Sequence, residues 1–138
     1  LDSIGEVLAG VKAVDDFARC GITHSSDIRD LFVPNFYFGC EPDDPVNVWA
    51  FRAKANPFNA KLNAIMGSDI GHFDCMDMAD VLPEAYELVE EGEMAEEDFR
   101  DFVFGNSVRL WGGTNPAFFK GTVIEKQAAK YLADESAQ

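Results

Sequence analysis

The sequence predicts an α/β protein built around a parallel sheet, and two short apolar runs are the main reason. Residues 36–39 and 64–67 are flanked by proline, glycine and acidic residues, which is typical of short buried strands. Residues 46–55, between the two runs, can form a helix that Pro57 would end. Strand, helix and strand fit within the roughly 30 residues of a βαβ unit, in which the two strands run parallel.

The segment before the first strand is predicted to be helical. A first helix places apolar side chains at helical spacing, namely Ile4, Val7, Leu8, Val11 and Ala18. Ser3 and Glu6 fit a capping box, and Gly21 fits the position just beyond a helix end. A short second helix is expected over residues 26–32, because Pro34 disfavours its continuation.

After the second strand the pattern becomes helical again. A strong helix is expected over residues 79–91, followed by Gly92 as the stop. Its apolar face consists of Val81, Leu82, Ala85, Leu88 and Val89. A further helix over residues 96–104 precedes a helical turn over residues 107–111, which Gly112 and Gly113 are expected to end. Residues 122–138 are expected to form a tail that frays after Tyr131.

The charge is strongly one-sided, with 25 acidic and 11 basic residues and a formal net charge of −14. A chain this acidic repels nucleic-acid phosphates and anionic membrane surfaces, so we expect neither as a partner. Nine of the acids, with a single basic residue, lie between Glu84 and Asp101. They alternate with apolar residues, as on the solvated faces of helices that cover a sheet. The alternative is a surface for cations or for a basic partner.

Cysteine usage and the N-terminal sequence indicate a reduced, cytoplasmic protein. The three cysteines, Cys20, Cys40 and Cys75, are odd in number and widely spaced, unlike those of a disulfide framework. No run approaches the roughly 20 apolar residues of a membrane span, and the first residues lack the basic start of a secretory signal. The chain begins at Leu1 without a methionine, which indicates a processed, cleaved or partial chain.

The most informative segment for function is residues 65–74, where an acid follows the second buried strand. In α/β sheets and barrels, ligand-binding and catalytic groups lie beyond the C-terminal ends of the strands. Asp69 occupies that position, with Ser68 beside it and His72 three residues further on. Asp69 can act as a metal ligand, as a general base or as both. The alternative is that its side-chain oxygens only cap the loop.

Further candidate residues surround this segment. Glu41 follows the first strand and can point toward the same edge of the sheet. Asp74 and two more aspartates precede a helix, where aspartate is favoured as a cap, so we expect a structural role for them. His72 also fits an ordinary hydrogen-bonded loop histidine. A purely structural metal site at Asp69, His72 and Asp74 is a further alternative.

Three short motifs follow one another at characteristic spacing. They are Phe-Tyr-Phe-Gly-Cys-Glu at residues 36–41, Met-Gly-Ser-Asp at residues 66–69 followed by His72, and Asp-Phe-Arg-Asp-Phe at residues 98–102 followed by Asn-Ser-Val-Arg-Leu-Trp-Gly at residues 106–112. In this order they resemble the C-terminal third of the amidohydrolase-related family, whose members are metal-dependent (β/α)8 barrels. The resemblance implies a partial TIM barrel, in which strand seven and strand eight are followed by closing helices.

The same resemblance implies roles for individual residues. Asp69 matches the strand-eight aspartate, which in the family binds the metal and often handles the proton of the metal-bound water. His72 matches a residue near the site whose role varies, and Ser68 and Glu41 would line the pocket. The implied activity is hydrolysis or decarboxylation of a small carboxylic acid with a divalent metal, zinc or manganese.

The chain departs from the family's pattern in its length and its missing ligands. Its only histidines are His24 and His72, and its 138 residues fall short of the roughly 250 of a complete barrel. We therefore expect residues 1–138 to be the C-terminal part of a larger enzyme, inactive alone, whose partner is the rest of the barrel or another copy. The alternative is a non-catalytic remnant or small acidic α+β protein that acts through oligomerisation, because open strand edges need partners.

Overall fold

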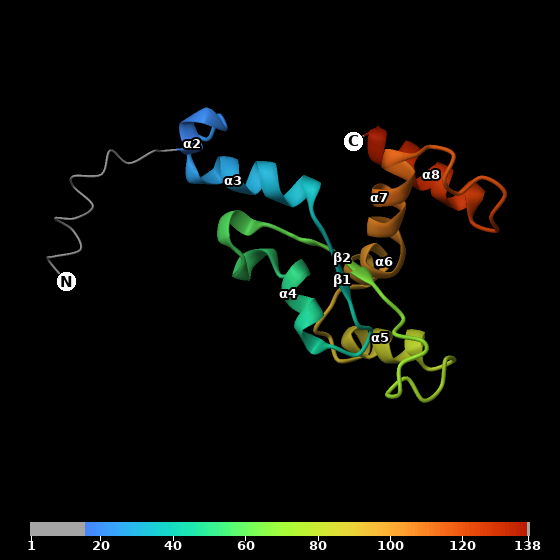
Figure 1. The fold of residues 1–138 in the computed structure, drawn as a ribbon. Coiled ribbons are helices and arrows are strands. Elements are labelled where there is room, and N and C mark those ends of the chain that lie inside the picture. The colour runs from blue at the N-terminus through green and yellow to red at the C-terminus, as the bar shows by residue number, and fades with distance from the viewer. Residues whose placement is uncertain (1–15, 138) are drawn as a thin grey trace, which may run out of the picture.

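The computed structural model describes residues 16–137, so most of the first predicted helix lies outside the described residues. Two short helices come first, α2 (Asp16–Arg19) and α3 (Ser25–Phe32). They precede strand β1 (Tyr37–Cys40), helix α4 (Val48–Phe51) and strand β2 (Asn63–Met66). The second half is helical, with α5 (Val81–Glu90), α6 (Glu96–Arg100), α7 (Asn106–Thr114) and α8 (Glu125–Ser136) (Figure 1).

The two strands pair in parallel, as the sequence predicts. Tyr37 lies opposite Asn63 and Cys40 opposite Met66, so each strand is displaced by one residue from its predicted range. Within residues 16–137 the sheet has two strands and is not closed into a barrel. Figure 1 shows this sheet at the centre, with α3 and α4 toward one side and α6 to α8 toward the other. The described part of the chain is a small mixed α/β unit.

The main core lies where β2 meets the surrounding helices. Phe102 is 0% exposed, and its ring meets the ring of Phe51 from α4 edge-on, with centroids 6.2 Å apart. Ala64 of β2, Leu88 of α5 and Met94 are buried in the same cluster. Removing this apolar surface from water is the main force that holds α4 and α5 onto the sheet.

Helices α6 and α7 form one continuous rod through a π-helical turn, Asp101–Gly105. The sequence predicts a break in this region and a stop at Gly112, but Gly112 lies inside α7. A Cβ atom at Gly112 would come within 2.8 Å of the Leu132 side chain on α8. The glycine therefore permits close helix packing, and the helix continues beyond it to Thr114.

A second core joins α7 to α8. Val108 of α7 and Ala128 and Tyr131 of α8 are buried together. The Tyr131 hydroxyl donates a hydrogen bond to Asp101 Oδ1 at 2.8 Å. Burial, reinforced by this bond to a carboxylate, raises the pKa of Tyr131.

Two polar side chains, Asn106 and Arg109, tie the rod to its neighbours. Asn106 is buried and donates from Nδ2 to the carbonyl oxygen of Ala64 in β2 at 2.8 Å, while its Oδ1 accepts from Arg109 Nη1 at 2.7 Å. Arg109 also donates from Nε to Glu135 Oε2 at 2.8 Å, and this bond lowers the pKa of Glu135. The sequence predicts fraying after Tyr131, but α8 continues to Ser136, and the Arg109 contact holds its last turn.

The predicted helix over residues 46–55 is broken in the structure. A 3-10 turn, Pro45–Asn47, leads into the single turn of α4, and two more 3-10 turns complete the connection to β2. Asp44 caps the first turn by accepting the Val46 N–H at 2.9 Å. Phe58 and Asn59 have left-handed φ angles of 57° and 54°, which interrupts helical geometry before the second strand.

Large apolar side chains remain at the surface around the sheet. Phe36 and Phe38 are exposed, and the Phe36 ring stacks on Phe32 with centroids 4.5 Å apart. Trp49 of α4 is also exposed. No helix among the described residues is both long and apolar enough to cross a membrane.

Candidate functional site

The site is set up by the parallel pairing of β1 and β2, which brings their C-terminal ends to one edge of the sheet. Cys40 and Met66 lie side by side at the ends of the strands. The Gly67 N–H donates to the Cys40 carbonyl oxygen at 2.7 Å and extends the pairing by one residue. Glu41 leaves β1 and Asp69 follows β2 at this same edge, as the sequence predicts.

Asp69 stands at the start of a tight turn. Its φ angle is 52°, in the left-handed region that aspartate and asparagine tolerate better than most residues. The Asp69 carbonyl oxygen accepts the His72 N–H at 3.1 Å, and Asp69 Oδ1 lies 2.7 Å from His72 Nδ1. Ser68 Oγ accepts the Ile70 N–H at 3.4 Å. The predicted grouping of Ser68, Asp69 and His72 beyond the second strand is confirmed.

Asp74 joins Asp69 and His72 in one cluster. One oxygen or nitrogen atom from each of the three side chains lies within 4.8 Å of the other two. Asp69 is the most enclosed, since its side chain is 19% exposed, whereas the His72 side chain is 71% exposed. The helix cap that the sequence favours for Asp74 is thus not its position, and the three side chains group as in the alternative that the sequence left open. In the loop before α5, Asp77 Oδ1 accepts the Ala79 N–H at 2.8 Å, and the N-cap residue of α5, Asp80, makes no side-chain cap bond.

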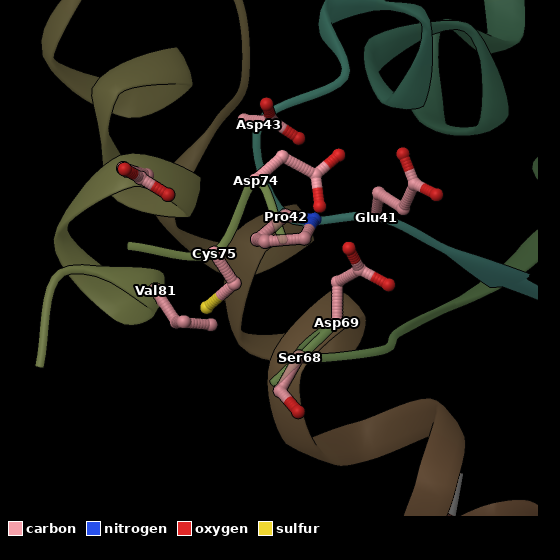
Figure 2. Close-up of a pocket in the computed structure, with 9 residues that line it drawn as sticks. Glu41, Pro42, Asp43, Ser68, Asp69, Asp74, Cys75 and Val81 are labelled. Carbon is pink, nitrogen blue, oxygen red and sulfur yellow. The ribbon is translucent and has the colours of Figure 1, made fainter. Parts of the chain in front are cut away.

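A small hollow of about 50 Å³ lies beside this cluster. Figure 2 shows the carboxylates of Glu41, Asp43, Asp69 and Asp74 gathered around Pro42, with the Ser68 hydroxyl directed away from them. Its full lining is Glu41, Pro42, Asp43, Ser68, Asp69, Asp74, Cys75, Val81 and Glu84. The predicted pocket residues Glu41 and Ser68 thus lie at the hollow.

Several residues of the hollow were missed by sequence reasoning. Asp43 looks like a turn residue in the sequence, yet it lies two positions beyond Glu41 at the same strand end. Glu84 lies in the first turn of α5. The order of strand, loop and helix in the sequence could have indicated that this turn lies near the end of the strand. Asn47 is buried and donates from Nδ2 to the Glu41 carbonyl oxygen at 2.6 Å, so it fixes the backbone on which Glu41 stands.

The thiols near the site are not activated. Partial burial raises the pKa of Cys75, and the nearby carboxylates of Glu84 and Asp69 raise it further. Burial and the charge of Asp44 raise the pKa of Cys40 in the same direction. A raised pKa keeps a thiol protonated at neutral pH, and the thiolate is the nucleophilic form. The surroundings of both cysteines thus disfavour the thiolate form.

Comparisons with protein-family models, with curated proteins and with solved structures found no match to this chain. What the site can do must be inferred from its own side chains.

The charged side chains that line the hollow are all acidic. No lysine or arginine is among the residues that line the hollow. Carboxylates that share a site repel one another, and a bound cation relieves that repulsion. Two carboxylates and one imidazole are donors that suit a divalent ion such as zinc or manganese. Asp69 and His72 contact each other, so a cation would compete with that pairing.

Proposed function

We propose that this chain supplies the C-terminal strands and the metal-binding aspartate of a hydrolase or decarboxylase of the amidohydrolase type. The observation that supports this most is the meeting of Asp69, His72 and Asp74 at the C-terminal edge of two parallel strands. Catalytic groups of (β/α)8 barrels lie at this edge. The remaining strands and histidine ligands would come from other parts of the same protein or from another copy.

Within this proposal, Asp69 and His72 hold a divalent cation, zinc or manganese, and Asp74 adds a third donor. The cation supplies Lewis-acid chemistry toward water or substrate. The Asp69 carboxylate accepts the proton of the attacking water, and Glu41 and Ser68 form part of the rim. The substrate is a small carboxylic acid. The acidic side chains of the rim repel the carboxylate of such a substrate, and the bound cation offsets this repulsion.

Asp69→Asn is the variant that tests the cation site. The amide is a poorer ligand than a carboxylate, so we expect Mn²⁺ and Zn²⁺ affinity to fall about tenfold or more, which corresponds to roughly 1.4 kcal/mol. Asparagine is the right replacement because it tolerates the left-handed φ of this position, whereas alanine would add backbone strain. Isothermal titration calorimetry with each metal ion on the full 138-residue chain gives both affinities.

A matched control is Asp77→Asn, which removes one charge from the same loop. Asp77 lies outside the three-residue cluster, and the amide oxygen of asparagine can keep the bond to the Ala79 N–H. We expect its metal affinity to stay within about twofold of the original chain, since exposed charges act weakly at a distance. Equal losses in the two variants would show that the metals respond only to net charge, and the proposal would fail.

A second candidate function is association with another copy of the chain. Two exposed aromatic side chains favour it, Phe38 in β1 and Phe36 just before this strand. In the two-stranded sheet of the described residues, β1 is an edge strand. Apolar clusters of this kind mark interaction surfaces, and unpaired strand edges invite pairing. Sedimentation velocity should then give a dimer that Phe38→Ser weakens. A monomer at all concentrations would exclude this candidate and leave the metal titration unaffected.

A further inference from the structure

Helix α5 carries apolar side chains on a face that the core does not use. Its buried face consists of Val81, Ala85 and Leu88. Leu82, which the sequence pattern assigns to that face, is 52% exposed, and Tyr86 is exposed one turn further along. A solvated outer helix does not need this second apolar stripe. The stripe is therefore a feature that the packing of α5 leaves unexplained.

The stripe forms one wall of a groove between α5 and α6. Phe99 of α6 meets Tyr86 edge-on, with ring centroids 5.1 Å apart. The other residues that line the groove are Leu82, Pro83, Glu87 and Glu90. Its volume is about 430 Å³, and it shares no lining residue with the hollow at Asp69. The groove has room for a large apolar side chain.

Both charged residues that line the groove are acidic. No lysine or arginine occurs between Lys61 and Arg100. Both of these flanking cations are engaged elsewhere, because Lys61 lies 2.6 Å from Asp98 and Arg100 lies over the ring of Tyr131. Glu87 and Glu90 are the charged residues among those that line the groove. An apolar groove with an acidic rim is complementary to an apolar segment that carries positive charge.

We propose that this groove docks a basic amphipathic helix of a protein partner. Its apolar side chains would sit between Leu82, Tyr86 and Phe99, and its lysines or arginines would face Glu87 and Glu90. In helix-in-groove recognition an amphipathic helix lays its apolar face, with anchors about one turn apart, into a hydrophobic groove such as this one. Charge complementarity selects this occupant, because Glu87 and Glu90 at the groove attract lysine or arginine and repel an acidic segment or an anionic membrane.

The test uses a synthetic 18-residue peptide of leucine and lysine whose leucines form one face of a helix. Fluorescence anisotropy measures its binding to the full chain. We expect Leu82→Gln to weaken binding about tenfold, the effect of losing one buried leucine contact. The control is Val123→Gln, the same loss of an exposed apolar side chain elsewhere, at a position that is 96% exposed. It should leave binding within about twofold, as is usual for a distant surface site.

Two further comparisons separate docking from general attraction to an acidic protein. A peptide of the same composition, scrambled so that no apolar face forms, should bind at least about tenfold more weakly if the groove recognises the apolar face of a helix. Glu90→Gln should weaken binding of the helical peptide more than Asp134→Asn on α8 does. Equal binding of the two peptides, or equal effects of Leu82→Gln and Val123→Gln, would overturn the proposal. Neither result bears on the metal site, whose residues are all different.

Discussion

Replacing Phe102 with alanine is expected to lower the free energy of unfolding by about 3–5 kcal/mol, the usual cost of removing a large aromatic side chain from a core. Phe102 is fully buried and is the largest such side chain among the described residues. It contacts Phe51 of α4 and lies in one cluster with Ala64 of β2 and Leu88 of α5. The resulting cavity would therefore loosen elements from both halves of the described chain at once.

Urea unfolding followed by circular dichroism measures this effect. Phe73→Ala is the matched control, because Phe73 is 92% exposed and its truncation should change stability by less than about 0.5 kcal/mol. The urea dependence of the unfolding free energy should be similar in both variants, which would show that the denatured states are comparable. If Phe102→Ala were as stable as Phe73→Ala, the described core would not be the one that holds this fold.

The strands could be predicted because each is a short apolar run closed by turn residues. Their parallel pairing followed from the length of the crossover alone, and the register confirms it. The broken helix between them could not be predicted from apolar spacing. Its course depends on Asp44, which caps a 3-10 turn, and on the left-handed geometry of Phe58 and Asn59. Neither feature leaves a periodic signal.

Tertiary contacts explain the other differences between prediction and structure. Gly112 reads as a helix stop in isolation, but α8 packs so close to α7 that a side chain there would collide with Leu132. The last turn of α8 looks like a frayed tail until Arg109, 26 positions earlier in the chain, is placed against Glu135. Local residue spacing cannot predict such contacts between distant residues, because they form only when the helices pack against each other.

The residues of the candidate site also differ in whether the sequence alone predicts their position. Asp69 and His72 could be predicted together, because a strand end followed by a tight turn brings them close in any parallel sheet. For Asp74 the sequence left two alternatives, a helix cap and a site shared with Asp69 and His72, and the course of the loop brings its carboxylate to theirs. Glu84 reaches the hollow from a separate helix. Residues joined by the strand pattern were thus predictable, whereas residues joined by loop and helix placement were not.

Asn106 is a buried polar side chain, and its substitution is expected to cause the second large loss of stability. It is 2% exposed, and its Nδ2 is the donor that satisfies the Ala64 carbonyl oxygen in β2. Asn106→Asp keeps the oxygen that accepts from Arg109 but removes the donor toward Ala64. An unpaired buried carbonyl facing a carboxylate is unfavourable, so stability at neutral pH should fall by about 1–3 kcal/mol.

The same substitution at Asn115 isolates this loss of a donor. Asn115 is exposed and uses its side-chain oxygen to accept the Ala117 N–H at 3.1 Å, a bond that aspartate can also make. Asn115→Asp should therefore change stability by less than about 0.5 kcal/mol, although it adds the same negative charge to a chain that already carries −14. Urea unfolding of the two variants at neutral pH makes the comparison. If both lost the same stability, the added charge would be the cause. A loss confined to Asn106→Asp would instead show that the buried amide at this position, which bonds Ala64, supports the contact between the helical rod and the sheet.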